Sequence, residues 1–432
     1  MTEFSWHENV AFDRQSVSRR RFLYGASAVA AAGAVNFRDV MSVRADELRK
    51  QGRAMILLFM QGGPSQFETF DPKPGTENGG PTTAISTTAP GIHIAEGWEK
   101  TAQQMKDIAI IRSMTTKEGE HLRAAYQMHT GYIPSGSVKH PSLGSCIAKE
   151  LAITDRELPS VVTIGDRGAN GSGAGFLGVD YEPFQISGRN VGAVPDNVGP
   201  IVGEKRFTRR QGLLDKLEGE FAARGGDTVV NNHRRIYDKS AKLVLSPMTK
   251  TFDLSLETAE TKERYGNSEF GKGCLLARRL IEAGVTFVEV RMNGWDSHQD
   301  VFDGVKGLAG KCDPALSALI ADLKDRGLFD KTLVMWTGEF GRTPKINPRT
   351  GRDHWPRNFN ALLAGGGIQG GQVIGETAKD GMGIVNDPVN IPDLFSTICK
   401  SLDVNPAKEN MSPIGRPLKI VDGGKPVTKL FG

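Results

Sequence analysis

Cysteine is scarce in this chain of 432 residues, which contains only four cysteines and no C-x-x-C pair. The four are too widely separated for a zinc ribbon or a disulfide scaffold. We therefore expect most of them to be buried as small apolar side chains. They are Cys146, Cys274, Cys312 and Cys399.

An excess of one charge is lacking as well. The chain has 54 lysines and arginines against 50 carboxylates, a net charge of +4 and a pI near 8.7. Apart from the N-terminal segment and residues 206–210, the basic residues are spread along the sequence. A nucleic-acid-binding protein more often shows a concentrated basic face with aromatic platforms, so we expect no nucleic-acid partner. With 38% hydrophobic and 24% charged residues, the chain is typical of a soluble globular protein.

The apolar stretch 25–35 is too short, and too rich in alanine and glycine, for a transmembrane anchor. It follows Ser18-Arg19-Arg20-Arg21-Phe22-Leu23, which resembles a twin-arginine export signal with Tyr24 in place of the final lysine. We assign residues 1–45 to this signal and a linker, and exclude them from the fold. The resemblance implies a periplasmic or extracellular protein that folds, and could load a metal, before export. No transmembrane segment is expected in the mature chain.

Continuous apolar runs bounded by turn residues predict strands buried on both faces, as in a parallel sheet. They lie at residues 54–60, 107–112, 159–164, 285–290, 332–336 and 360–364. Helical apolar spacing predicts helices over 268–283 and 313–328. Strands that alternate with helices predict an α/β sandwich over residues 46–432, with a mostly parallel central sheet flanked by helices.

Residues 165–203 interrupt this rhythm, because they are rich in Gly, Asn, Pro and Val and show little periodicity. Long irregular loops in compact domains are usually functional or mobile. A charged helical hairpin is predicted next, over roughly 206–245. We interpret 165–245 as an insertion, or a lid over the strand ends.

Two charged clusters follow predicted strands directly. Asp296 and His298 come after the strand 285–290, where side chains two residues apart on an extended backbone share a face. A solvated turn would give the same triplet. However, the carboxyl ends of strands are where an open α/β sheet places its ligand site, and Asp and His are ligands for divalent metals.

The second cluster is Glu339-Phe340-Gly341-Arg342, after the strand 332–336, with His354 a short loop later. Arg342 offers a fork of donors suited to phosphate or sulfate, although a structural Glu–Arg pair would look the same. A metal-bound histidine usually donates its other nitrogen to a carboxylate or carbonyl, and Asp353 or Asp296 could serve His354. We predict Asp296, His298, Glu339 and His354 as metal ligands.

A third segment carries His121 and His129, eight residues apart and close to one face of a predicted helix. His121 lies at the helix start, where backbone amides favour anions, whereas His129 precedes Gly131 and could simply cap the helix. We favour His121 as a site residue. The glycine-rich loop 61–65 could approach a ligand, but it is neither a Walker loop nor a G-x-S-x-G nucleophile elbow.

These motifs together resemble the family known as domain of unknown function 1501, which is sulfatase-like and placed near the alkaline phosphatase superfamily. The resemblance rests on the leader and on Gly62-Gly63-Pro64-Ser65 with Phe70-Asp71-Pro72, as well as the segments around His121, Asp296, Glu339 and His354. It covers nearly the whole mature chain. It implies an alkaline phosphatase/sulfatase-like sandwich.

The sulfatase pattern C-x-P-S-R-x-x-x-L-T-G can be aligned on Thr130-Gly131, and its nucleophile position then falls on His121. The superfamily's Asp-His-Gly corresponds to Glu339-Phe340-Gly341, and its aspartate after the first strand corresponds to Gln61. The usual Cys or Ser nucleophile is therefore missing, while enough ligands remain for one metal.

From the residues and the resemblance together we expect a metal-dependent hydrolase for a sulfate or phosphate ester. One divalent ion (zinc, manganese or calcium) would polarise the ester and activate a water. Arg342 would clamp the anion, and His121 would serve as a further ligand or as the general acid–base group. The alternative is a binding or structural protein on the same scaffold with an eroded site, because a fold alone does not guarantee activity.

Overall fold

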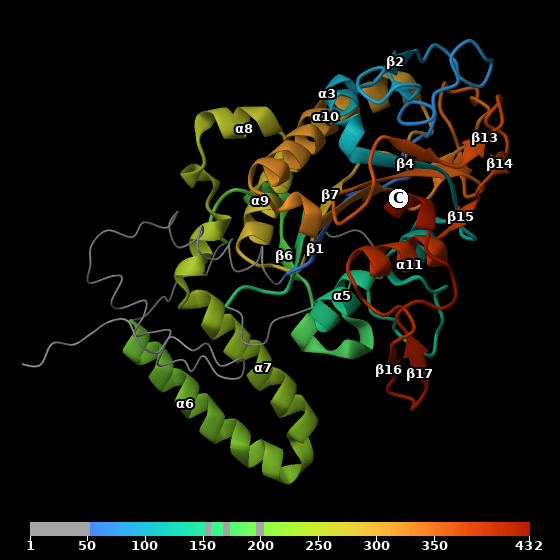
Figure 1. Cartoon of the computed structure of the whole chain (residues 1–432). Helices are drawn as coiled ribbons and strands as arrows, with labels where there is room; N and C mark the ends of the chain where they lie inside the picture. Colours follow the sequence, from blue (N-terminus) through green and yellow to red (C-terminus); the bar gives the residue numbers. More distant parts are fainter. Residues whose placement is uncertain (1–51, 152–156, 167–172, 196–202) are drawn as a thin grey trace, which may run out of the picture.

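The computed structural model describes residues 52–151, 157–166, 173–195 and 203–432, so the predicted export signal lies outside the described residues. At its centre is a nine-stranded sheet of order β12-β4-β11-β8-β1-β7-β5-β6, with β15 paired to β4 (Figure 1). Its strands are β1 (Ala54–Met60), β4 (Ile108–Thr115), β5 (Val161–Ile164), β6 (Phe184–Ile186), β7 (Phe287–Met292), β8 (Thr332–Thr337), β11 (Phe359–Ala364), β12 (Gln372–Ile374) and β15 (Val389–Asn390).

The sheet is mostly parallel, as predicted. β1 pairs in parallel with both β7 and β8, and β5 pairs in parallel with β7. β11 is the exception, because it runs antiparallel between β4 and β8 and makes the sheet mixed. All six predicted strands are present, with ends shifted by at most three residues.

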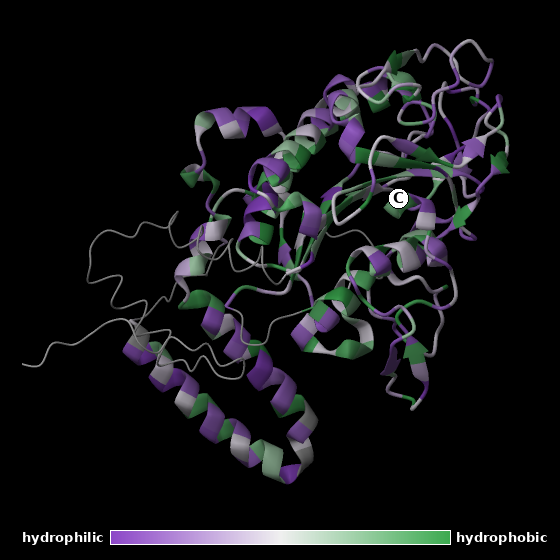
Figure 2. Ribbon diagram, in the orientation of Figure 1, coloured by the Kyte–Doolittle hydropathy of each residue, from purple (hydrophilic) through white to green (hydrophobic). Residues whose placement is uncertain are grey.

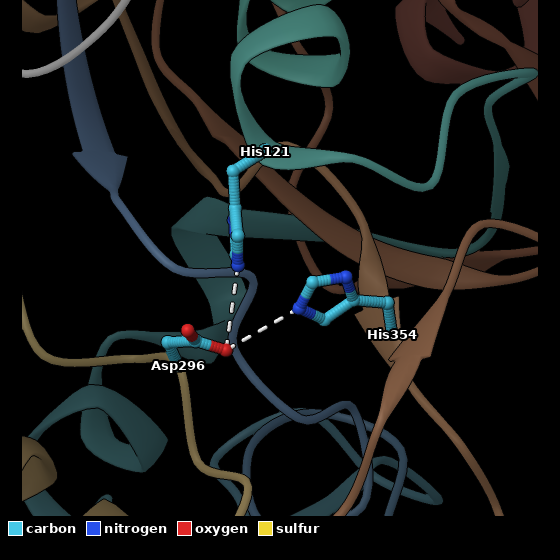
Figure 3. A group of neighbouring side chains, drawn as sticks. All are labelled: His121, Asp296 and His354. Atoms are coloured by element: carbon cyan, nitrogen blue, oxygen red, sulfur yellow. Dashed lines mark ion pairs between the residues drawn. The ribbon is translucent and has the colours of Figure 1, made fainter.

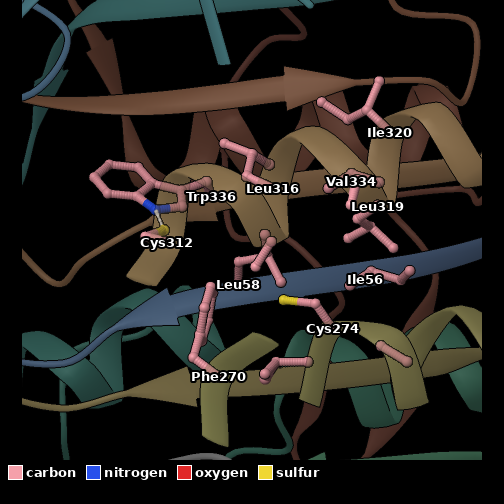
Figure 4. Close-up of a cluster of buried hydrophobic side chains, with 14 of the residues drawn as sticks. Ile56, Leu58, Phe270, Cys274, Cys312, Leu316, Leu319, Ile320, Val334 and Trp336 are labelled. Atoms are coloured by element: carbon pink, nitrogen blue, oxygen red, sulfur yellow. Dashed lines mark hydrogen bonds between the residues drawn. The ribbon is translucent and has the colours of Figure 1, made fainter. Parts of the chain in front are cut away.

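Helices cover both faces of the sheet, which explains why its central strands are apolar on both sides. On β1, Ile56 and Leu58 belong to one core cluster, while Leu57 and Phe59 belong to the other. Figure 4 shows the first cluster, where β1 and β8 side chains meet those of α9 and α10. The helices are α3 (Glu99–Gln103), α4 (His121–Thr130), α5 (Leu143–Leu151), α6 (Glu204–Phe221), α7 (Asp227–Val244), α8 (Ala259–Tyr265), α9 (Glu269–Glu282), α10 (Val301–Asp325) and α11 (Ile391–Ser401).

The four cysteines are free and buried, as expected. Burial raises the pKa of the Cys146 thiol to about 12, so this side chain stays a protonated apolar group at neutral pH. Short two-stranded pairs complete the fold: β2 (Ala84–Ser86) with β3 (His93–Ala95), β9 (Gly341–Arg342) with β10 (His354–Trp355), β13 (Glu376–Thr377) with β14 (Ile384–Asn386), and β16 (Glu409–Met411) with β17 (Pro417–Lys419).

The predicted start of one helix was wrong. The helix expected to begin at residue 313 begins at Val301, and Pro314 lies inside it. The apolar face formed by Val305, Ala309 and Cys312 is buried, so packing keeps the turns before the proline helical although Pro314 cannot donate a backbone hydrogen bond.

The described residues of the stretch 165–203 are less irregular than expected, because they include β6, which pairs with β5 at the edge of the sheet. The predicted hairpin is present as α6 and α7, joined by a π-helical turn at Ala222–Gly226. Whether 165–245 acts as a lid stays a prediction. Among the described helices, none combines the length and apolarity needed to cross a bilayer.

Candidate metal centre

The carboxyl ends of three adjacent strands build the site. β1 leads into the glycines Gly62 and Gly63, β7 leads to Asp296 and His298, and β8 leads to Glu339. Because β1 lies between β7 and β8 and is parallel to both, all three loops leave the sheet at one edge.

Two histidines reach this edge from elsewhere in the chain. His121 is the first residue of α4, which begins there because the Glu120 carboxylate accepts from the amides of Leu122 and Arg123. His354 lies on β10, directly across from Arg342 of β9. The structure thus brings together the three segments that the sequence had identified separately.

Three imidazoles converge on one oxygen, Oδ1 of Asp296. The Nε2 atoms of His121, His298 and His354 lie 3.3, 3.1 and 3.4 Å from it. Figure 3 shows His121 and His354 pointing at Asp296 from α4 and β10. One ligand atom each from His121, Asp296 and His354 lies within 4.8 Å of the others, which is a spacing that can hold a metal ion.

Each imidazole is held at its other nitrogen by an acceptor. Nδ1 of His121 lies 2.6 Å from the Glu339 carboxylate, and Nδ1 of His298 lies 2.9 Å from that of Asp353. Nδ1 of His354 lies 2.9 Å from the backbone carbonyl of Gly119. Carboxylates and carbonyls accept, so Nδ1 carries the proton in each neutral ring and the Nε2 lone pairs face the centre.

Glu339, which we predicted as a metal ligand, contacts His121 and Gly62 in the structure. Its carboxylate is fully buried, lies behind His121 and accepts the backbone N–H of Gly62 at 3.0 Å. Gly62 has a φ of 116°, and a Cβ there would lie 2.4 Å from the backbone nitrogen of Asp296. Only glycine lets the two loops approach so closely.

Arg342 is buried, and its guanidinium is directed into the protein. It donates to the carbonyls of Gly62, Gly63 and Arg352, and to Oδ1 of Asp296 at 2.5 Å. Four of its five N–H groups are used in this way. The sequence had indicated an anion clamp, whereas in the structure the Arg342 guanidinium joins the loops after β1 and β9 to the Asp296 carboxylate.

Burial and neighbouring charges set the protonation of the site. For His121, burial lowers the pKa, but the hydrogen bond and charge of Glu339 outweigh it, so the pKa is raised. The pKa of His354 is lowered, mainly by burial. Burial raises the pKa of Asp296, but the contact with Arg342 outweighs it, so the carboxyl remains ionised. The site therefore combines His121, whose imidazole is more basic than usual, with the ionised carboxylate of Asp296 and the neutral imidazole of His354.

His129, the disfavoured histidine, lies away from the centre. It is buried, with Nδ1 on the carbonyl of Ala125 and Nε2 3.0 Å from Glu289 on β7. Glu289 also contacts Arg291 at 2.6 Å. This buried group was not predicted, because its only signal in the sequence is two charges in an otherwise apolar strand. The role of Gly119 was not predicted either, because a backbone carbonyl leaves no mark in a residue pattern.

Similar solved structures include a sulfatase from Pseudoalteromonas sp. (13% identity, TM-score 0.39, 85% of this chain and 71% of that chain covered). Another is an alkaline phosphatase superfamily protein from Vibrio parahaemolyticus (13%, 0.38, 88% and 70%). A third is the phosphonate monoester hydrolase of Agrobacterium radiobacter (11%, 0.41, 88% and 77%).

No curated protein matches the sequence. The family described as "Protein of unknown function (DUF1501)" matches residues 52–431, which include every residue of the centre described above. The chain therefore belongs to the DUF1501 family.

Proposed function

We propose that this protein is an exported, metal-dependent hydrolase that acts on a sulfate or phosphate ester. One observation carries the proposal: three Nε2 atoms face a single carboxylate oxygen while each Nδ1 is already held by an acceptor. Nε2 of His298 and Nε2 of His354 are 3.1 Å apart. Two lone pairs at that distance repel each other unless a cation or a proton lies between them.

The donors fit a transition metal better than calcium. Calcium takes six to eight oxygen ligands, whereas this group offers imidazoles and one carboxylate, the ligands that suit zinc. Nε2 of His121 is buried and has no hydrogen-bond partner among the described residues. An ion at the centre would satisfy this atom. Of the three metals predicted from sequence, we favour zinc, with manganese second.

The number of ligands is consistent with a catalytic role. His121, Asp296 and His354 form the compact group of three, and catalytic zinc sites keep three protein ligands and one open position. His298 stands beside them with 39% of its side chain exposed. We assign it to the open side of the site, where a substrate would enter.

Each protein group has a defined task in this proposal. A divalent ion held here would supply a Lewis acid for the ester oxygen and make nearby water more acidic. Glu339 makes His121 a stronger base and holds its ring. Arg342 orients Asp296, and we assign it this positioning role in place of the anion clamp. Asp353 orients His298, which is exposed enough to exchange a proton with a substrate.

The missing nucleophile favours direct attack by water. His121 occupies the aligned nucleophile position, and its Nδ1 is bound to Glu339. The same fact supports the alternative, a binding or structural protein on the same scaffold with an eroded site. The two proposals differ in activity, because the alternative predicts no turnover.

Metal analysis tests the centre first. Protein purified without added metal should contain about one zinc per chain, and His354→Ala should lose it while the matched variant His93→Ala, at an exposed position on β3, keeps it. The proposal would be contradicted if the purified wild type contained no metal and if neither zinc nor a chelator changed its melting temperature.

Activity is measured separately on a panel of aryl sulfate, phosphate and phosphonate esters. We expect zinc-dependent turnover that disappears in Asp296→Ala and persists in His93→Ala. Zinc bound by the wild type without any turnover above the Asp296→Ala background would favour the binding protein.

A further inference from the structure

The α6–α7 hairpin carries an exposed apolar surface that the proposed function does not use. Five large apolar side chains on it are between 46% and 67% exposed. We call this set the hairpin apolar face: Leu213, Leu217 and Phe221 from α6, with Val229 and Ile236 from α7. In Figure 1 the hairpin extends from the body at the lower left, and in Figure 2 apolar residues alternate with polar ones along both helices.

Helical geometry places these five side chains together. The less exposed positions of α6, including Phe207 and Leu214, mark the side that packs on α7, and Val230 with Ala241 marks the facing side of α7. At 100° per residue, the three apolar α6 positions lie to one side of this seam. The two α7 positions fall on the same side, because the helices run in opposite directions.

The contact with the body of the protein leaves the hairpin apolar face exposed. Arg235 lies 3.1 Å and Lys239 lies 3.6 Å from the Asp180 carboxylate. Lys239 is three residues after Ile236 and neighbours it on α7, so this contact borders the face. Val229 and Ile236 nevertheless remain 67% and 46% exposed beside it.

Basic residues continue the α6 stripe. Arg206 and Arg210 precede Leu213 at the same helical spacing, so they lie on the same side of α6, and both are exposed. The same spacing places one exposed carboxylate on this side, that of Glu220. Residues 204–245 contain ten lysines and arginines against six carboxylates. The resulting excess of four positive charges equals the net charge of the whole chain.

We propose that the hairpin apolar face docks on a lipid bilayer with anionic headgroups. Helices with leucine and phenylalanine on one side and arginines beside them bind at such interfaces by apolar burial and by attraction to anionic lipid. A second copy docked in parallel would instead bring Arg206 and Arg210 against their own counterparts. The hairpin would hold the enzyme at a membrane surface without spanning the bilayer.

Vesicle sedimentation of the full chain tests this proposal. Wild type should bind vesicles of phosphatidylglycerol and phosphatidylcholine, and bind pure phosphatidylcholine more weakly. Leu217→Ser with Phe221→Ser should lower the partition coefficient roughly tenfold or more. Arg206→Gln with Arg210→Gln should remove the preference for phosphatidylglycerol, and added salt should weaken the wild type in the same way.

The matched control is Met411→Ser with Ile414→Ser, which removes two side chains that are 65% and 62% exposed elsewhere on the protein. It should bind like the wild type, and all variants share the N-terminal segment. Equal binding by wild type and the Leu217/Phe221 variant would overturn the proposal. So would a wild-type dimer in light scattering that this variant converts to a monomer, because a second copy would then be the occupant.

Discussion

The carboxylate of Glu339 gives the sharpest test of how the centre is built. Its Oε1 lies 2.6 Å from Nδ1 of His121 and accepts the Gly62 N–H at 3.0 Å. In Glu339→Gln, an amide oxygen at the Oε1 position can still accept from His121 and Gly62, so His121 stays oriented. The negative charge is removed, together with the second contact of the Gly62 N–H, which is 3.2 Å from Oε2. In Glu339→Ala both acceptors are lost.

The expected loss of zinc affinity follows from this difference between the two variants. Removing a partner behind a metal-bound histidine typically weakens metal binding 10- to 100-fold, about 1.4 to 2.7 kcal/mol. We expect Glu339→Gln near the lower figure, because His121 stays oriented and only loses basicity. Glu339→Ala should lie near the upper figure, because the ring is freed as well.

Zinc affinity is measured by competition with a chromophoric chelator, with Glu77→Gln at an exposed position as the control. In the metal-free protein, NMR titration should show a lower pKa for His121 in Glu339→Gln, since the Glu339 charge raises it in the wild type. Unchanged zinc affinity in both Glu339 variants, with native folding by circular dichroism, would refute the assignment of Glu339 behind His121.

Three further predictions concern the stability of the centre and of the core beneath it. Arg342→Gln should lower the free energy of unfolding by about 3 kcal/mol or more in urea denaturation, because buried carbonyls lose their hydrogen-bond donors and Asp296 loses its cation. An unfolding midpoint equal to that of wild type would show that the buried guanidinium is dispensable. Burial raises the pKa of Glu289, but Arg291 and His129 outweigh it and lower the pKa to about 2. Because this value is below the ordinary value of about 4.3, ionised Glu289 stabilises the folded state by about 3 kcal/mol above pH 4.3. This stabilisation is lost as the pH falls toward 2. Urea titrations at several pH values should therefore show a steeper acid loss in wild type than in Glu289→Gln, and parallel curves would contradict it. Gly62→Ala should cost about 1–3 kcal/mol of stability and weaken zinc binding, whereas Gly91→Ala, which also has a positive φ but open space around its Cβ, should bind zinc normally; equal zinc binding by the two variants would mean that the close loop approach is unimportant.

Much of the scaffold could be predicted from local sequence. A strand buried on both faces must be apolar along its whole length, so β1 and its neighbours were visible as continuous runs bounded by glycines. The start of α10 was not visible, because it depends on packing that keeps the turns before Pro314 helical. The edge strand β6 was hidden for a similar reason: its three residues are a strand only because β5 pairs with them.

The sequence by itself determined the family, the α/β class and most of the residues of the centre, because residue types and strand ends are local properties of the chain. Tertiary structure alone decided which of those residues face the centre and which hold another residue in place. His121 faces Asp296 and Glu339 stands behind it, although 218 positions separate the two in sequence. Which nitrogen faces a ligand, and which carboxylate stands behind it, depend on ångström-scale distances between segments that only the folded sheet brings together.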